Sequence, residues 1–145
     1  MRAARTPRPR RRPARPPPLT WPDATWRWTE DGALALTLPV PGSANRQWRA
    51  GKGRTHKSAH ARQYEESAGW ALASCPKLRG PVQVTLCWIR QRATGDLDNR
   101  IKPTLDALKQ IAFEDDAQVR RITAEILDAP DLAACLLVTI APDAG

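Results

Sequence analysis

The chain has 145 residues, of which 41% are hydrophobic and 26% are charged, and its formal net charge is +8 at pH 7. This length predicts one domain with a modest core. No segment approaches the roughly 18 consecutive apolar residues of a membrane span, and the N-terminus lacks the apolar stretch of a signal peptide. The three cysteines show no Cys-x-x-Cys pairing, which argues against a zinc site or a disulfide framework. We therefore expect a cytoplasmic protein whose cysteines are small core residues.

The positive charge is concentrated at the N-terminus. Residues 1–18 contain seven arginines, six prolines and no acidic residue, so the rest of the chain has 16 of the 23 basic residues against 15 acidic ones. This composition cannot bury a core and predicts a disordered arm over residues 1–24, followed by a folded domain over residues 25–145. The arm could bind nucleic-acid phosphates, or it could be a dispensable leader.

Two segments follow the arm. In residues 25–39, apolar residues recur at every second position on both sides of Asp31-Gly32, which is a typical turn sequence. This pattern predicts a β-hairpin whose first strand is an added edge strand. Residues 45–62 have no acidic residue and include two glycines, which predicts a mobile cationic loop. Trp48 in this loop either stacks on an exposed base or packs against the domain. We expect phosphate contacts from the loop's basic side chains, which are Arg46, Arg49, Lys52, Arg54, Lys57 and Arg62.

The first helix is predicted from about residue 59 to residue 74, with Ser58 as its N-cap. Residues 82–90 are apolar and typical of a central strand. Two further strands are predicted at residues 119–127 and 132–140.

A second helix is predicted between these strands. Pro103 suits only a first helical turn, so this helix begins either near Lys102 or as a distorted turn at Asp98. The resulting order, β-α-β-α-β-β, predicts a single α+β domain in which a mixed sheet is covered by two helices.

The most informative motif is Asp96-Leu97-Asp98-Asn99-Arg100-Ile101-Lys102, followed by Glu114-Asp115-Asp116. Residues two apart on an extended backbone point the same way, so we expect Asp96 and Asp98 to share a divalent cation such as Mg²⁺. Lys102, one helical turn beyond Asp98, could position water or stabilise a phosphorane oxygen. Taken singly, Asp98 fits a helix N-cap, Lys102 an exposed lysine and Asp115-Asp116 a solvated turn. Together they indicate metal-dependent phosphate chemistry.

The motif also resembles a known family, the RusA Holliday-junction resolvases. The resemblance is carried by Gly95-Asp96-Leu97-Asp98-Asn99-Arg100-Ile101-Lys102-Pro103, by Leu105-Asp106-Ala107-Leu108 and by Asp115-Asp116-Ala117-Gln118-Val119. Residues 38–46 and 53–58 resemble the first strand of that family and the loop after it. The match spans roughly residues 34–141 and leaves the N-terminal segment outside.

The resemblance implies catalytic roles for Asp96, Asp98, Lys102 and one member of the pair Asp115-Asp116, of which we favour Asp116. The carboxylates would bind Mg²⁺, with Mn²⁺ as a substitute, and the cationic loop would bind DNA. The substrate would be branched DNA, a four-way junction with near two-fold symmetry, so we expect a homodimer with two matched sites. The family also implies a bacterial or phage-encoded, nucleoid-associated protein.

Two other functions fit the same residues. One is a metal-dependent nuclease that prefers flaps, forks or other branched DNA. The other is a junction-binding module without catalysis. The presence of Asp96, Asp98, Lys102 and Asp116 together argues against the second.

Overall fold

The computed structural model describes residues 25–51 and 53–145. The predicted arm over residues 1–24 and Lys52 lie outside this part of the chain. None of the helices in the described ranges is long and apolar enough to span a membrane.

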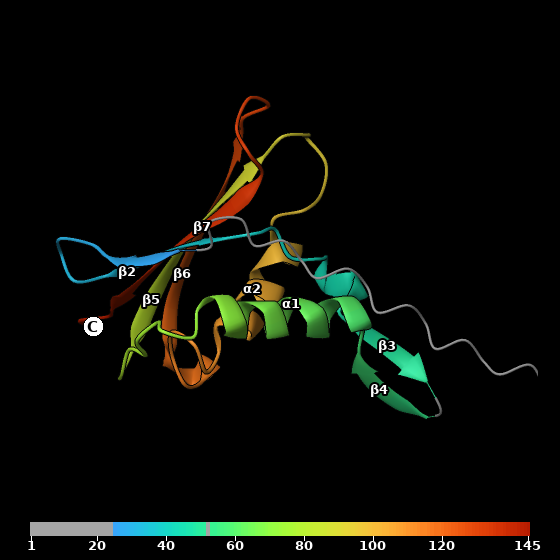
Figure 1. Ribbon diagram of the computed structural model, residues 1–145, viewed down its shortest axis with the longest axis horizontal. Helices are drawn as coiled ribbons and strands as arrows, with labels where there is room; N and C mark the ends of the chain where they lie inside the picture. The colour runs from blue at the N-terminus through green and yellow to red at the C-terminus, as the bar shows by residue number, and fades with distance from the viewer. Residues whose placement is uncertain (1–24, 52) are drawn as a thin grey trace, which may run out of the picture.

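A five-stranded mixed sheet forms the centre of the domain (Figure 1). β5 and β6 run parallel, whereas all the other neighbouring strands pair antiparallel. The mixed sheet and its two helices confirm the predicted α+β class. In spatial order the strands are β1 (Trp26–Trp28), β2 (Leu34–Leu38), β7 (Cys135–Pro142), β5 (Val82–Arg90) and β6 (Val119–Asp128).

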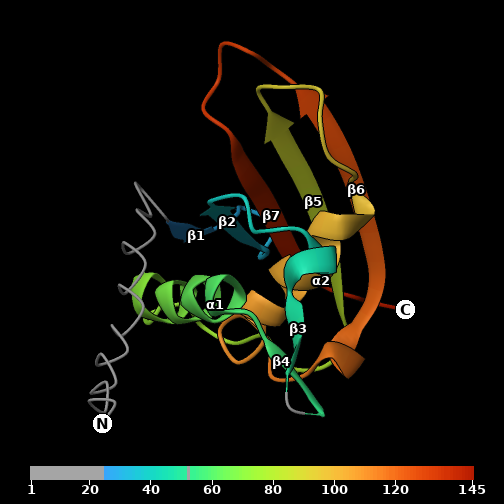
Figure 2. The ribbon, with the colours of Figure 1, turned by 90° about the vertical axis from the view of Figure 1, so that its right-hand side faces the viewer.

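One face of this sheet forms the core. Alternate residues of β2, β5 and β7 are buried in register, so that Val138 lies between Leu36 and Leu86. Two helices, α1 (Ala59–Ala71) and α2 (Asp98–Leu108), lie side by side against this face (Figure 2), and Leu108 of α2 is fully buried in the same cluster. Burial of each such side chain contributes about 1.5–3 kcal/mol to stability.

The strand and helix predictions hold with shifted ends. The hairpin over residues 25–39 and the strand over residues 82–90 are present, and β1 is an edge strand as expected. The Ser58 hydroxyl accepts a hydrogen bond from the Ala61 N–H and caps α1, which ends at Ala71 rather than near residue 74. The last strand begins at Cys135 rather than at residue 132, because a hydrogen-bonded turn closed by Leu132 N–H and the Ala129 carbonyl occupies its predicted start.

The prediction of a mobile loop over residues 45–62 is wrong, because the backbone there forms regular structure. After a short 3₁₀ turn η1 (Ala44–Arg46), the chain forms a two-stranded hairpin of β3 (Trp48–Gly51) and β4 (Arg54–Lys57). The hairpin projects from the body of the domain (Figures 1 and 2). Main-chain pairing between β3 and β4 overrides the flexibility that the glycines suggest.

The cysteines are all free, as predicted, but only one is a core residue. Cys75 is buried, and burial raises the pKa of its thiol to about 11. Cys87 and Cys135 are half-buried on β5 and β7.

Candidate active site

Lys102 lies at the centre of the candidate site. Its Nζ atom is 2.6 Å from Asp106 Oδ1, one turn further along α2, and 3.5 Å from Asp116 Oδ2. The hydrogen bond to Asp106 raises the pKa of Lys102, and the charges of Asp106 and Asp116 add to this effect. The side chain therefore stays a cation while 57% of its surface remains accessible to solvent.

The two adjacent aspartates, Asp115 and Asp116, have different partners. Asp116 opens the 3₁₀ turn η2 (Asp116–Gln118) before β6 and faces Lys102. Asp115 caps this turn through a 2.9 Å hydrogen bond from Ala117 N–H, and its other oxygen lies 4.0 Å from Lys109 Nζ. Asp116, and not Asp115, is therefore the member of the pair that contacts Lys102.

Asp98 is the first residue of α2, and Asp96 lies in the loop before it. The backbone between them is not extended, because Leu97 has φ −61° and ψ −44°. The argument that an extended backbone gives the two carboxylates one face was therefore wrong. The alternative role of Asp98 is wrong as well, since Leu97 holds the N-cap position and no side chain caps the helix.

The loop that carries Asp96 is held by aromatic and guanidinium groups. The guanidinium of Arg100 lies 4.8 Å from the centre of the Trp88 ring and donates a 2.6 Å hydrogen bond to the Pro41 carbonyl. Arg90 lies 5.5 Å from the same ring and donates to the Gly95 carbonyl at 3.0 Å. The residue before Asp96 is therefore tied to β5 and, through Trp88, to α2.

The cationic residues predicted to bind DNA fall into two groups. Lys57 is half-buried at the end of β4, forms an ion pair with Glu65 and lies 5.7 Å from the centre of the Trp48 ring. Arg62 is exposed on α1. The backbones of Arg46, Arg49 and Arg54 belong to η1, β3 and β4, whereas their side chains and Lys52 lie outside the described part.

The fit of a divalent cation can be tested on Asp116. Its Oδ1 atom is buried and has no hydrogen-bond partner among the described residues, which favours a cation at this oxygen. Asp96 and Asp98 are exposed, and their carboxylates make no hydrogen bond or ion pair with any described residue. Within the described ranges no three His, Cys, Asp or Glu side chains are close enough to hold a metal by themselves. Mg²⁺ usually keeps several waters, so a site with few protein ligands fits its chemistry.

The sequence reasoning assigned no role to Asp106 or Gln47. Asp106 accepts hydrogen bonds from both Lys102 and the Gln47 side chain. The i, i+4 spacing of Lys102 and Asp106 was the available signal for this contact. Nothing in the sequence pattern pointed to Gln47, which lies 59 residues away in the chain.

The fold and the site define an α+β protein with an acidic, lysine-containing surface suited to phosphodiester chemistry. The family model described as Endodeoxyribonuclease RusA matches residues 38–140. The chain therefore belongs to the RusA family of endodeoxyribonucleases.

Curated relatives agree with this assignment. A crossover junction endodeoxyribonuclease RusA of Escherichia coli K12 is 38% identical over 90 residues, covering 59% of this chain and 75% of the relative. The enzyme of the same name from Enterobacteria phage 82 is 38% identical over 89 residues, covering 58% and 74% of the two chains.

Proposed function

We propose that this protein is a Mg²⁺-dependent endonuclease that resolves four-way DNA junctions as a homodimer. Membership of the RusA family supports the DNA-cleaving activity, and the names of the relatives support the junction as substrate. The observation that carries the proposal is the position of Lys102, a solvent-accessible cation beside the partly unpartnered carboxylate of Asp116.

Each proposed catalytic residue has a role that follows from its surroundings. Asp96, Asp98 and Asp116 are the proposed metal ligands, and because no three such side chains of the described residues lie close enough to hold a metal by themselves, some would bind it through coordinated water. A bound Mg²⁺ would polarise the phosphodiester and lower the pKa of a coordinated water. Lys102 directs its ammonium toward negative charge that develops on the phosphate oxygens. The N-terminal end of α2, where Asp98 lies, favours a nearby anion through the helix dipole.

The β3–β4 hairpin is the proposed DNA-gripping element. It projects from the domain and carries Lys57, while Arg62 is exposed on the first turn of the adjoining helix. Such contacts would follow the phosphates and the branch shape more than the base sequence. Two copies related by two-fold symmetry would place one site on each of two opposed strands. We propose that the protein acts on bacterial or phage DNA in the nucleoid.

The test is incubation of purified protein with a labelled four-way junction, with and without Mg²⁺. We expect paired cuts across the junction only with Mg²⁺, and little cleavage of linear duplex. If flaps or forks are cut equally well, the substrate is branched DNA in general and not the four-way junction in particular. Tight binding without any cleavage in Mg²⁺ or Mn²⁺ would contradict the enzymatic function.

A further inference from the structure

The Asp106 carboxylate is an unusual partner for an exposed lysine. Its side chain is only 10% exposed, whereas the side chain of Lys102 is 57% exposed. A buried carboxylate is costly unless it is paired and hydrogen-bonded. Both of its oxygens are used, because Oδ1 accepts from Lys102 and Oδ2 accepts from Gln47 Nε2. This differs from an ordinary i, i+4 pair on a helix surface, in which both partners are solvated.

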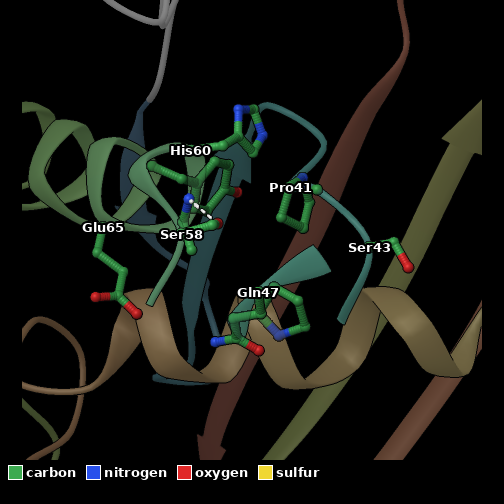
Figure 3. A pocket seen from close by; sticks show the side chains of 10 residues that line it. Pro41, Ser43, Gln47, Ser58, His60 and Glu65 are labelled. Atoms are coloured by element: carbon green, nitrogen blue, oxygen red, sulfur yellow. Dashed lines mark hydrogen bonds between the residues drawn. The ribbon is translucent and has the colours of Figure 1, made fainter. Parts of the chain in front are cut away.

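Gln47 is itself buried, and its main chain is held by hydrogen bonds on both sides. The residue is 4% exposed. Its main-chain N–H donates to the Ala44 carbonyl at 3.1 Å, and its main-chain carbonyl accepts from Ser58 N–H at 2.8 Å. Figure 3 shows Gln47 lying over α2, in a pocket that it lines together with Ser58 and Glu65. A buried amide held by its main chain can hold a carboxylate in one orientation.

We propose that Asp106 is a positioning residue that directs the Lys102 ammonium toward Asp116, and that Gln47 fixes the orientation of Asp106. This inference rests on the proposed nuclease function for its effect on rate. Asp106 acts through Lys102 and does not itself contact DNA or metal. A displacement of about 1 Å in a reacting group can cost about 100-fold in rate, so the orientation of this pair matters.

The arrangement also connects the site to the hairpin. Gln47 immediately precedes β3, and the Ser58 that donates to it immediately follows β4. The Gln47–Asp106 hydrogen bond therefore joins the base of the β3–β4 hairpin to the last turn of α2. A hairpin held by DNA would keep Gln47, and with it Asp106, in the same place.

The kinetic test uses Asp106→Asn, which keeps the shape of the side chain and removes its charge. We expect its single-turnover rate on a four-way junction to fall by about tenfold to 100-fold with unchanged junction affinity. Gln47→Ala should lower the rate in the same direction by less. In a Lys102→Ala background, Asp106→Asn should cause no further loss, because the two residues act as one unit. Asp131→Asn is the matched control, the same chemical change at an exposed turn residue, and should cleave like the parent.

A second measurement does not depend on cleavage. The ¹⁵N signal of the Lys102 ammonium should show slow hydrogen exchange in the metal-free protein, and Asp106→Asn and Gln47→Ala should each accelerate this exchange while Asp131→Asn does not. A parent protein that fails to cut junctions would overturn the nuclease function and leave this NMR test to decide the positioning. Cleavage by Asp106→Asn at the parental rate, additive losses with Lys102→Ala, or an unchanged Lys102 signal would overturn the role of Asp106.

Discussion

The Lys102 ammonium joins parts of the chain that are distant in sequence. It contacts Asp106 within α2 and Asp116 at the turn before β6, and Asp106 in turn binds Gln47 beside η1. Asp96 and Asp98 are left without partners among the described residues. Both oxygens of Asp106 are therefore occupied, whereas Asp116 keeps one oxygen free and Asp96 and Asp98 keep their carboxylates free for a metal ion.

A lysine variant tests the functional role of this contact. Lys102→Ala should lower the single-turnover cleavage rate by about 100-fold or more with little loss of junction affinity, because its charge acts on the transition state. Lys109→Ala is the matched control, since Lys109 is also an exposed lysine but lies 4.0 Å from Asp115 instead of near Asp116. Equal rates for Lys102→Ala and Lys109→Ala would remove Lys102 from the site.

At this scale the sequence predicted residue types better than partners. The Asp-x-Asp motif and Lys102 were selected by residue type and spacing, and the preference for Asp116 over Asp115 came from the resemblance. The structure brings Asp116 and Lys102 to 3.5 Å. Asp106 was visible only as a helical neighbour of Lys102. The contact with Gln47 depends on tertiary packing of η1 against α2, which no local pattern encodes.

The loop between β5 and α2 is the element that places Asp96. In Figure 1 it arches from the end of β5 to the start of α2. Gly95 has φ +95°, a value that other residues rarely adopt, and a Cβ atom there would lie 2.8 Å from Trp88 Cη2. Its carbonyl accepts from Arg90, whose guanidinium also pairs with Asp128 at 2.7 Å. The glycine therefore permits the close approach that ties this loop to the sheet.

Substitution of this glycine should disturb both the fold and the site. Gly95→Ala adds about 1–2 kcal/mol of left-handed backbone strain and about 1–3 kcal/mol from the crowded Trp88 ring. Gly80→Ala is the control, because Gly80 has φ +75° but nothing within 4 Å of the added carbon. We expect Gly95→Ala to unfold at lower denaturant concentration than Gly80→Ala and to cleave junctions more slowly. Equal unfolding midpoints would show that the Trp88 contact does not restrain the loop.

The β3–β4 hairpin shows why a sequence can mislead about an element. Its sequence is short and basic and contains Gly51 and Gly53, a composition that is typical of a loop. The Trp48–Lys57 cross-strand pair, with the lysine near the aromatic ring, favours a hairpin but becomes recognisable only once the register is known.

For the whole molecule, the strands of the central sheet, its two helices and the α+β class could be predicted from the sequence, but the β3–β4 hairpin and the order of the strands in the sheet could not. The alternation of Leu34, Leu36 and Leu38 predicted a strand with one buried face. The pairing of β2 with β7, from the opposite end of the chain, depends on complementary packing of two such faces. Residues 1–24 carry much of the net charge and lie outside the described residues.

The charge of the seven arginines in residues 1–18 predicts how DNA affinity depends on salt concentration. Each phosphate neutralised contributes about −0.9 to the slope of log affinity against log salt, so full engagement would contribute roughly −6. Deletion of residues 2–18 should weaken binding to junction and duplex alike and flatten the salt dependence. The single-turnover rate at saturating protein should hardly change. Identical salt slopes for the two proteins would support the dispensable-leader alternative.

The central claim is that the acidic motif is a metal-dependent catalytic site, and Asp98 tests it most directly. Asp98 neither caps α2 nor pairs with a described residue, so Asp98→Asn removes a charge without removing a structural contact. The measurement is single-turnover cleavage of a labelled four-way junction in Mg²⁺, with junction affinity measured in parallel. We predict that Asp98→Asn binds the junction as the parent does and cuts it about 100-fold more slowly or not at all. Cleavage at the parental rate would contradict the assignment of this motif as the active site.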